Sequence, residues 1–229
     1  MIISRCKKDE FNVVAVINRD MGVYDICWGK EDVFENIGYT DEETGEWVDT
    51  GEVRDTDYCT FEMERVYSRN ISTWLLDSIF LKAQRVPKMA EIREMGRLLG
   101  FDDAEVLEWM KKNLLNTISR YDKSENVEDF TIGGVHLWLD SSMRNKVREN
   151  LESCEWEGLT ETVLRIDGFS LPTTITQGWQ MYYAVLKYAR ETWNVTEIHK
   201  AAVPKLGTMD DVEVYEATFA DAYPPKLSF

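Results

Sequence analysis

The sequence predicts an α+β fold, with a small antiparallel β unit, central helices, and a C-terminal module of two hairpins with helices. Three observations lead to this expectation. Short runs rich in β-branched and aromatic residues, separated by turn-forming pairs, fill about the first 66 residues. Apolar residues at helical spacing follow, up to about residue 120. Beyond that point, two hairpin patterns with glycine turns alternate with helical patterns, and no β-α-β series suggests a nucleotide-binding fold.

We therefore divide the chain into an acidic β-rich unit at residues 1–66, a helical segment at 67–120, and an α+β module at 121–229. The last boundary is expected near residues 120–128, because Tyr121-Asp-Lys-Ser-Glu-Asn is polar and resembles a linker. A length of 229 residues allows one large domain or two small ones, and two is the expected number.

Two β-rich runs open the first segment. Residues 11–17 end at the turn-prone residues 18–22, and Val23 to Trp28 form the second run. In residues 31–64 apolar residues such as Trp47 recur, and Thr-Gly pairs supply turns, so we expect short strands or a hairpin with an acidic solvent face.

The acidity of the chain is concentrated in residues 31–64. The whole chain has 42 Asp and Glu against 26 Lys and Arg, a net charge of −16. Residues 31–64 hold 13 of these acids and one base, Arg54, a local net charge of −12. A calcium loop is not expected here, because the acids around Gly45 lack the spacing of a calcium-binding loop. The residues chosen to represent this acidic surface are Asp41, Glu42, Glu43 and Glu46.

The predicted helices begin and end at recognisable signals. Ser72 or Thr73 caps the first helix, and Pro87 separates it from a second that stops at Gly100. Asp102 caps the third, with Glu105 completing a capping box.

The C-terminal module repeats a simple order of hairpin and helix. Glycines at 133–134 and the Asp167-Gly168 pair form the two hairpin turns. Asp140 caps the helix between them, and a long helix follows Pro172, with a possible kink at Asn194. Thr208 and Asp211 resemble the capping box of a last short helix before an extended tail, residues 223–229.

Composition excludes several classes of protein. A nucleic-acid binder needs a basic face, which so acidic a chain lacks. No apolar run approaches the roughly 20 residues of a membrane span, and the N-terminus lacks the apolar core of a signal peptide, so we expect synthesis in the cytoplasm and no membrane partner. Four cysteines, widely spaced and without nearby histidines, are expected to be small buried side chains.

The sequence contains no persuasive catalytic pattern. His136 and His199 are far apart, Gly133-Gly134 is too short for a phosphate loop, and Ser141-Ser142 lacks the glycines of a nucleophile elbow. Paired carboxylates such as Asp102-Asp103 stand at helix starts, where the helix dipole accounts for them. We therefore expect no enzyme activity, no metal and no cofactor.

Aromatic residues in the C-terminal module are the strongest candidates for subunit contacts, because aromatic side chains often anchor interfaces. The competing interpretation, an intramolecular helix core, stays open. The expected interface residues are Trp179, Tyr182, Tyr183, Trp193, Tyr223 and Phe229.

An ordered series of residues carries a resemblance over almost half the chain. The series is Tyr121-Asp-x-Ser, Val127, Phe130, Gly134, Trp138-Leu-Asp140, Arg144, the Pro172 helix with Met181 to Tyr188, Asn194-Val-Thr, His199 and Tyr223-Pro-x-Lys-Leu-x-Phe229. It resembles a domain of unknown function at the C-terminus of virion and prophage proteins from phages of gut Bacteroidetes, including crAss-like phages. One departure is Arg165, where an aromatic residue is expected after Leu164.

The resemblance implies a structural component of a tailed-phage virion. The expected protein is a head-fibre protein, attached to the capsid, or a fibre adaptor, with other virion proteins as partners and a homo-dimer or trimer as its assembly. A tail or tail-fibre accessory protein is the alternative in the same class. Two other classes stay open: an acidic DNA mimic that inhibits a host enzyme, and a hydrolase of cell-surface glycans.

Overall fold

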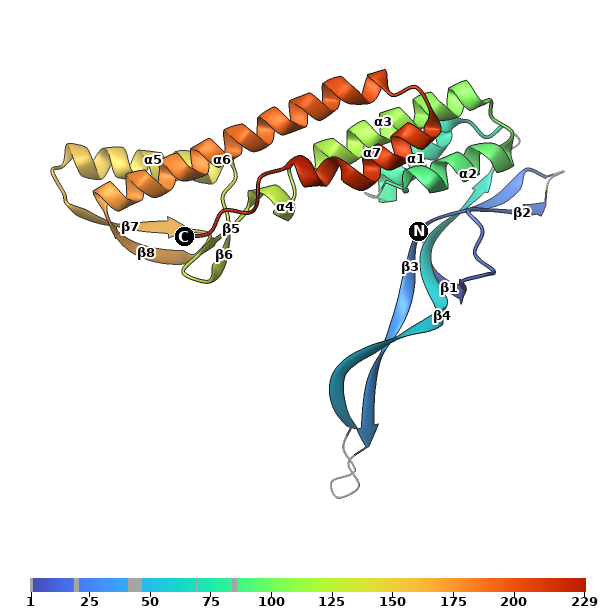
Figure 1. Cartoon of the computed structure of the whole chain (residues 1–229), viewed down its shortest axis with the longest axis horizontal. Helices are drawn as coiled ribbons and strands as arrows, with labels where there is room; N and C mark the ends of the chain where they lie inside the picture. Colours follow the sequence, from blue (N-terminus) through green and yellow to red (C-terminus); the bar gives the residue numbers. More distant parts are fainter. Residues whose placement is uncertain (1, 19–20, 41–46, 69, 84–85) are drawn as a thin grey trace. The chain divides into compact units, whose positions relative to one another are not determined.

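The computed structural model describes residues 2–18, 21–40, 47–68, 70–83 and 86–229 (Figure 1). Helices and small antiparallel sheets make up these residues, so the predicted α+β fold is confirmed. The chain forms two compact units, Met1–Met110 and Lys111–Phe229. The division between them falls inside a helix, Asp103–Tyr121, rather than in the polar stretch after it.

A four-stranded antiparallel sheet forms the first part of unit 1. Its strands are β1 (Ile2–Lys7), β2 (Val14–Asn18), β3 (Val23–Thr40) and β4 (Trp47–Tyr67), in the order β1-β4-β3-β2. The predicted antiparallel β unit is confirmed, and the sequence did not predict β1. Each outer strand covers only part of the central pair: β1 pairs with residues 58–63 of β4, and β2 with residues 23–26 of β3.

The far half of the β3–β4 hairpin therefore extends beyond the sheet as a two-stranded ribbon (Figure 1). We define the ribbon as residues 33–40 and 47–56. In the described part of the chain, no third strand pairs with it. From the sequence, both short strands and a hairpin were consistent with residues 31–64. The structure has one long hairpin, whose register shifts at three irregular places.

Three helices build the core of unit 1 against the sheet: α1 (Thr73–Ala83), α2 (Met89–Leu99) and the first half of α3 (Asp103–Tyr121). The ring of Trp28 lies 5.2 Å from that of Phe80, which in turn stacks 6.3 Å from Trp109. The predicted ends are confirmed: Gly100 closes α2 at φ 80°, and Asp102 accepts a 2.9 Å hydrogen bond from the Glu105 amide.

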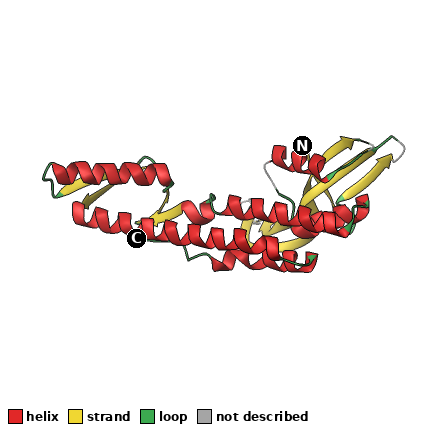
Figure 2. Ribbon diagram, turned by 90° about the horizontal axis from the view of Figure 1, so that it is seen from above, coloured by secondary structure: helices red, strands yellow, loops and turns green. Residues whose placement is uncertain are grey.

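In unit 2, two hairpins lie beside a long helix (Figure 2). Its elements are α4 (Glu125–Glu128), β5 (Asp129–Ile132), β6 (Val135–Trp138), α5 (Ser141–Trp156), β7 (Glu161–Ile166), β8 (Phe169–Thr174), α6 (Ile175–Ala202) and α7 (Met209–Thr218). Both predicted hairpins are confirmed, and Asp167 has the positive φ, 49°, that its turn needs.

Side-chain caps fix the ends of these helices. Asp140 accepts from the Met143 amide at 2.8 Å, and capping boxes begin α6 at Thr174 and α7 at Thr208, as predicted for Asp140 and Thr208. At Asn194, where the sequence suggests a kink, α6 continues without a break to Ala202. Asparagine is tolerated there since its side chain is exposed.

The core of unit 2 forms where α5 and α6 pack with the two hairpins. Phe130, Leu151, Leu164 and Val185 are among its buried members. Gly178 on α6 admits this packing, because a Cβ there would lie 2.6 Å from a methyl group of Leu151. A small residue at 178 thus lets α5 approach α6 closely.

We expect Leu151→Ala to lower the free energy of unfolding by about 2–5 kcal/mol, because it removes a fully buried side chain and leaves a cavity. Chemical denaturation followed by circular dichroism measures the change. Leu159→Ala is the matched control, since Leu159 is 48% exposed, and should change stability by less than about 1 kcal/mol. Equal effects of the two variants would contradict this core.

Candidate functional site

Helix α6 divides the predicted aromatic stripe between two faces. Consecutive residues of a helix point about 100° apart, so Tyr182 and Tyr183 cannot face the same way. Tyr182 and Tyr188 are buried in the core of unit 2, whereas Tyr183 and Trp193 are 59% and 57% exposed. The structure therefore brings only part of the stripe together at the surface.

Trp179 connects the buried and the exposed parts. Its ring stacks on Tyr183, with centroids 5.5 Å apart, and meets Tyr182 edge-on at 5.6 Å. Its Nε1 donates a 3.1 Å hydrogen bond to the Glu155 carboxylate on α5. Because Trp179 is held from both sides, it fixes the position of the exposed Tyr183 ring.

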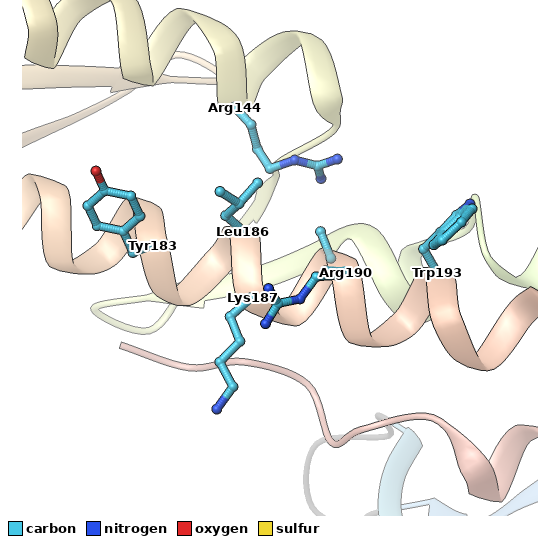
Figure 3. Close-up of a pocket in the computed structure, with 7 residues that line it drawn as sticks. Arg144, Tyr183, Leu186, Lys187, Arg190 and Trp193 are labelled. Carbon is cyan, nitrogen blue, oxygen red and sulfur yellow. The ribbon is translucent and has the colours of Figure 1, made fainter.

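The exposed face of α6 carries a groove of about 770 Å³. Figure 3 shows Tyr183, Leu186 and Trp193 along the helix, with Arg144 on one side and Lys187 and Arg190 on the other. Ala189 completes the lining. The positions 183, 186, 187, 190 and 193 recur at three- and four-residue spacing, so they share one face of the helix. The groove is thus an apolar strip with cations at both edges.

No carboxylate lines this groove. The backbone before α5 orients Arg144, because the Arg144 Nη1 donates a 2.7 Å hydrogen bond to the Leu139 carbonyl. Lys187 lies 3.8 Å from Glu191, a surface pair of small energy, and Arg190 forms no ion pair with the described residues. The lining is cationic, but Glu191 lies beside Lys187 and Glu128 interacts electrostatically with Arg144, so the net positive charge of this face of α6 is small.

The ribbon of unit 1 presents the opposite combination of side chains. Residues paired directly across an antiparallel ladder point to the same face. Phe34 pairs with Asp55, Asn36 with Val53 and Gly38 with Asp49. The Trp47 ring lies over the Gly38 backbone, in the space that a Cβ would fill. We call this surface the Trp47 face; its members are Phe34, Trp47, Asp49, Val53 and Asp55.

The large apolar side chains of the Trp47 face are exposed. Phe34, Trp47 and Val53 are 58%, 61% and 62% accessible. Among the carboxylates, Asp49 accepts hydrogen bonds from Asn36 at 3.0 Å and from the Gly51 amide at 2.8 Å. Asp55 pairs with Lys8. This face therefore combines an uncovered apolar stripe with one carboxylate, Asp49, held in a fixed position.

The opposite face of the ribbon has a similar net charge, because Lys8 pairs with Asp55 on the Trp47 face, and it exposes fewer large apolar side chains, Tyr39 at 57% and Ile37 at 38%. Glu35 pairs across the ladder with Arg54, and their charged groups are 2.9 Å apart. Glu52 lies beside Ile37 on the same face. The acidic residues chosen from the sequence, Asp41, Glu42, Glu43 and Glu46, lie outside the described residues.

The two predicted interface residues of the tail lie within unit 2. The Tyr223 hydroxyl is 2.7 Å from Thr196 Oγ1, and its ring is 5.0 Å from that of Tyr121. Phe229 is 42% exposed, and its amide donates a 2.8 Å hydrogen bond to the Thr131 carbonyl on β5. The tail is thereby attached to the first hairpin of the module.

A buried polar cluster holds the C-terminal helices against α6. Thr196 Oγ1 donates to Asp122 at 2.8 Å, and His199 Nδ1 lies 2.7 Å from the Tyr215 hydroxyl. The His199 ring also touches Phe219 and Tyr223. Burial lowers the pKa of His199 and raises that of Tyr215, so at neutral pH the tyrosine keeps its proton and His199 stays uncharged.

The metal-ligating side chains of the described residues do not cluster. These residues contain no group of three or more His, Cys, Asp or Glu side chains placed to hold a metal ion. His136, which pairs with Asp129 at 3.1 Å, and His199 stand at different places in unit 2. Within the same residues, no helix has the length and apolar character needed to cross a bilayer.

Comparison with protein-family models, with curated proteins and with solved structures finds no match. Sequence reasoning identified Tyr183 and Trp193 but missed Leu186, Lys187 and Arg190, which the helical spacing from Tyr183 would have found. It also did not single out Phe34 and Val53.

We expect the His199 cluster to make stability depend on pH. The pKa of His199 is lower in the folded state than its unfolded value of about 6.5. As the pH falls through that range, the folded state therefore takes up fewer protons than the unfolded state, and the protein loses stability. The contribution of His199 is present above about pH 6.5 and is lost below it. Unfolding free energies between pH 7.5 and 5 should therefore fall less steeply in His199→Gln than in the natural chain.

His136→Gln is the control for this experiment, because the His136 side chain is 72% exposed. It should keep the pH dependence of the natural chain. If instead His199→Gln and the natural chain fell in parallel, His199 would not be the buried neutral group described here.

Proposed function

We propose that this chain is a structural subunit of a tailed-phage virion, a head-fibre protein or fibre adaptor that assembles as an oligomer and carries no enzyme activity. The observation that carries the proposal is the ribbon. A two-stranded hairpin alone is marginal in water, and exposed apolar stripes mark surfaces for other proteins. The Trp47 face keeps three large apolar side chains uncovered. In a protein that assembles with others, such a face can be covered by a partner, whereas in a monomeric enzyme it would promote aggregation.

The module at 121–229 supports the proposal in two ways. It carries the ordered residues that resemble the phage domain, and several of these residues have structural roles. Asp140 caps α5, Phe130 and Tyr188 pack edge to face at 5.4 Å, and Tyr223 joins Thr196. The resembling residues thus maintain the fold of a compact module, which suits a building block.

Mass spectrometry of particles purified from the phage that carries this gene tests the proposal. The chain should be present in virions, and a copy number that matches a set of capsid symmetry positions favours the head. A few copies would favour the tail. Absence from intact particles, with the chain abundant in the infected cell, would contradict a structural role.

We also expect incorporation to need the ribbon. A variant in which Asn-Gly replaces residues 34–55 keeps the pairing of β1 and β2 with the central strands, so it should fold. Its incorporation into particles should fall at least about tenfold, since the exposed apolar side chains are gone. Immunoblotting of purified particles measures this.

Trp156→Ala is the control, because Trp156 is exposed and lies on α5, outside the ribbon. It should be incorporated normally. Normal incorporation of the shortened variant would show that the ribbon does not attach the chain.

A further inference from the structure

We propose that the ribbon of one copy docks, through its Trp47 face, on the α6 groove of a second copy. The occupant of the groove is thus a segment of this same protein. The inference deepens the proposed function and rests on it, because a fibre or adaptor subunit needs contacts with its own kind. Ribbon and groove are different surfaces, so the contact is head to tail.

Charge is the first reason to pair these surfaces. The groove presents Arg144, Lys187 and Arg190 and has no carboxylate in its lining. The Trp47 face presents Asp49, which has no ion pair among the described residues, and Asp55, which Lys8 pairs with. Opposite potentials on two surfaces favour their encounter and set their orientation.

Side-chain type is the second reason. Both surfaces place large apolar groups between their charges: Tyr183, Leu186 and Trp193 in the groove, and Phe34, Val53 and Trp47 on the ribbon. An exposed aromatic pair such as Tyr183 and Trp193 is typical of residues that dominate binding energy. A flexible acidic peptide would supply the charge but not a rigid apolar stripe.

Length is the third reason. From Tyr183 to Trp193 the α6 face extends about 15 Å, at 1.5 Å per residue. On the ribbon, the distance from Phe34 to Gly38, over which Trp47 lies, is about 14 Å at 3.4 Å per residue. A patch of this length predicts weak association of each pair, with a Kd of about 1–100 μM, which repeated contacts in a particle would reinforce.

Analytical ultracentrifugation of the full chain tests the docking. The natural chain should associate in 50 mM salt and dissociate as salt approaches 0.5 M, because screening weakens charge pairing. The groove variant Lys187→Glu/Arg190→Glu should associate at least about a hundredfold more weakly. Lys200→Glu/Lys205→Glu makes the same charge change in unit 2 outside the groove lining, at the C-terminal end of α6 and beyond it, and should associate as the natural chain does.

The ribbon variant Asp49→Lys/Asp55→Lys should lose association to a similar extent, whereas Glu35→Lys/Glu52→Lys, on the opposite face, should retain it. Because Asp49 and Asp55 also make contacts within unit 1, Phe34→Ser is a second ribbon variant, with Ile37→Ser on the opposite face as its control. Circular dichroism confirms that each variant is folded.

Mixing the two charge variants is the decisive measurement. Each alone is a monomer, but the mixture contains one intact ribbon and one intact groove on different copies, so association should return. A natural chain that stays monomeric at about 500 μM in 50 mM salt would overturn the proposal. So would association that only the groove variant loses, which would indicate a groove-to-groove dimer. Presence in virions, measured separately, would leave the structural role intact in either case.

Discussion

The pairing of β3 with β4 is the interaction on which unit 1 depends. Over residues 58–67 of β4 this pair is the centre of a sheet, and the Phe80 ring of α1 packs on Trp28 there. Over the ribbon the same pairing continues without a third strand. There the hairpin is held by its own ladder, by Thr50 and Thr56, whose hydroxyls donate to carbonyls of β3, and by the Trp47 ring on Gly38. The folded sheet thus supports a ribbon that would be marginal alone.

Helix α6 imposes a comparable division on unit 2. Its buried face carries Tyr182, Val185 and Tyr188 into the core, and the cap at Thr174 determines where that face begins. With 3.6 residues per turn, the positions between them must face outward. The helical period therefore places the buried residues on one side of α6 and the groove residues on the other. The groove residues are held in position because the opposite side of the same helix packs in the core.

Local signals determined what the sequence could predict. Side-chain caps and glycine turns act over three or four residues, so Asp102, Asp140 and Thr208 located their helices correctly. Strand β1 escaped prediction because Ile2-Ile-Ser-Arg-Cys is too mixed to show alternation, and its partner lies more than 50 residues away. The length of the ribbon was also not predicted, because charged residues interrupt the alternation of apolar residues on both of its faces.

The candidate site was only half predictable, because periodicity fixes a face but not its surroundings. Trp179, Tyr182, Tyr183 and Trp193 all follow helical spacing, and only packing against the hairpins decides which of them are buried. The contribution of Arg144 from α5 depends on how two helices meet. No spacing within either helix contains that information.

The distribution of carboxylates bears on the acidic DNA mimic. B-DNA carries one charge per about 1.7 Å of its axis, whereas the ribbon between Phe34 and Thr40 extends about 20 Å. Along that length the described ladder carries Glu35, Asp49, Glu52 and Asp55, or one carboxylate per about 5 Å, divided between two faces. Arg54 neutralises one of them, and Lys8 binds Asp55. The exposed side chains of Phe34, Trp47 and Val53 lie between these carboxylates. The described ribbon therefore suits a partner with an apolar surface and cationic edges better than a partner that binds the phosphates of DNA.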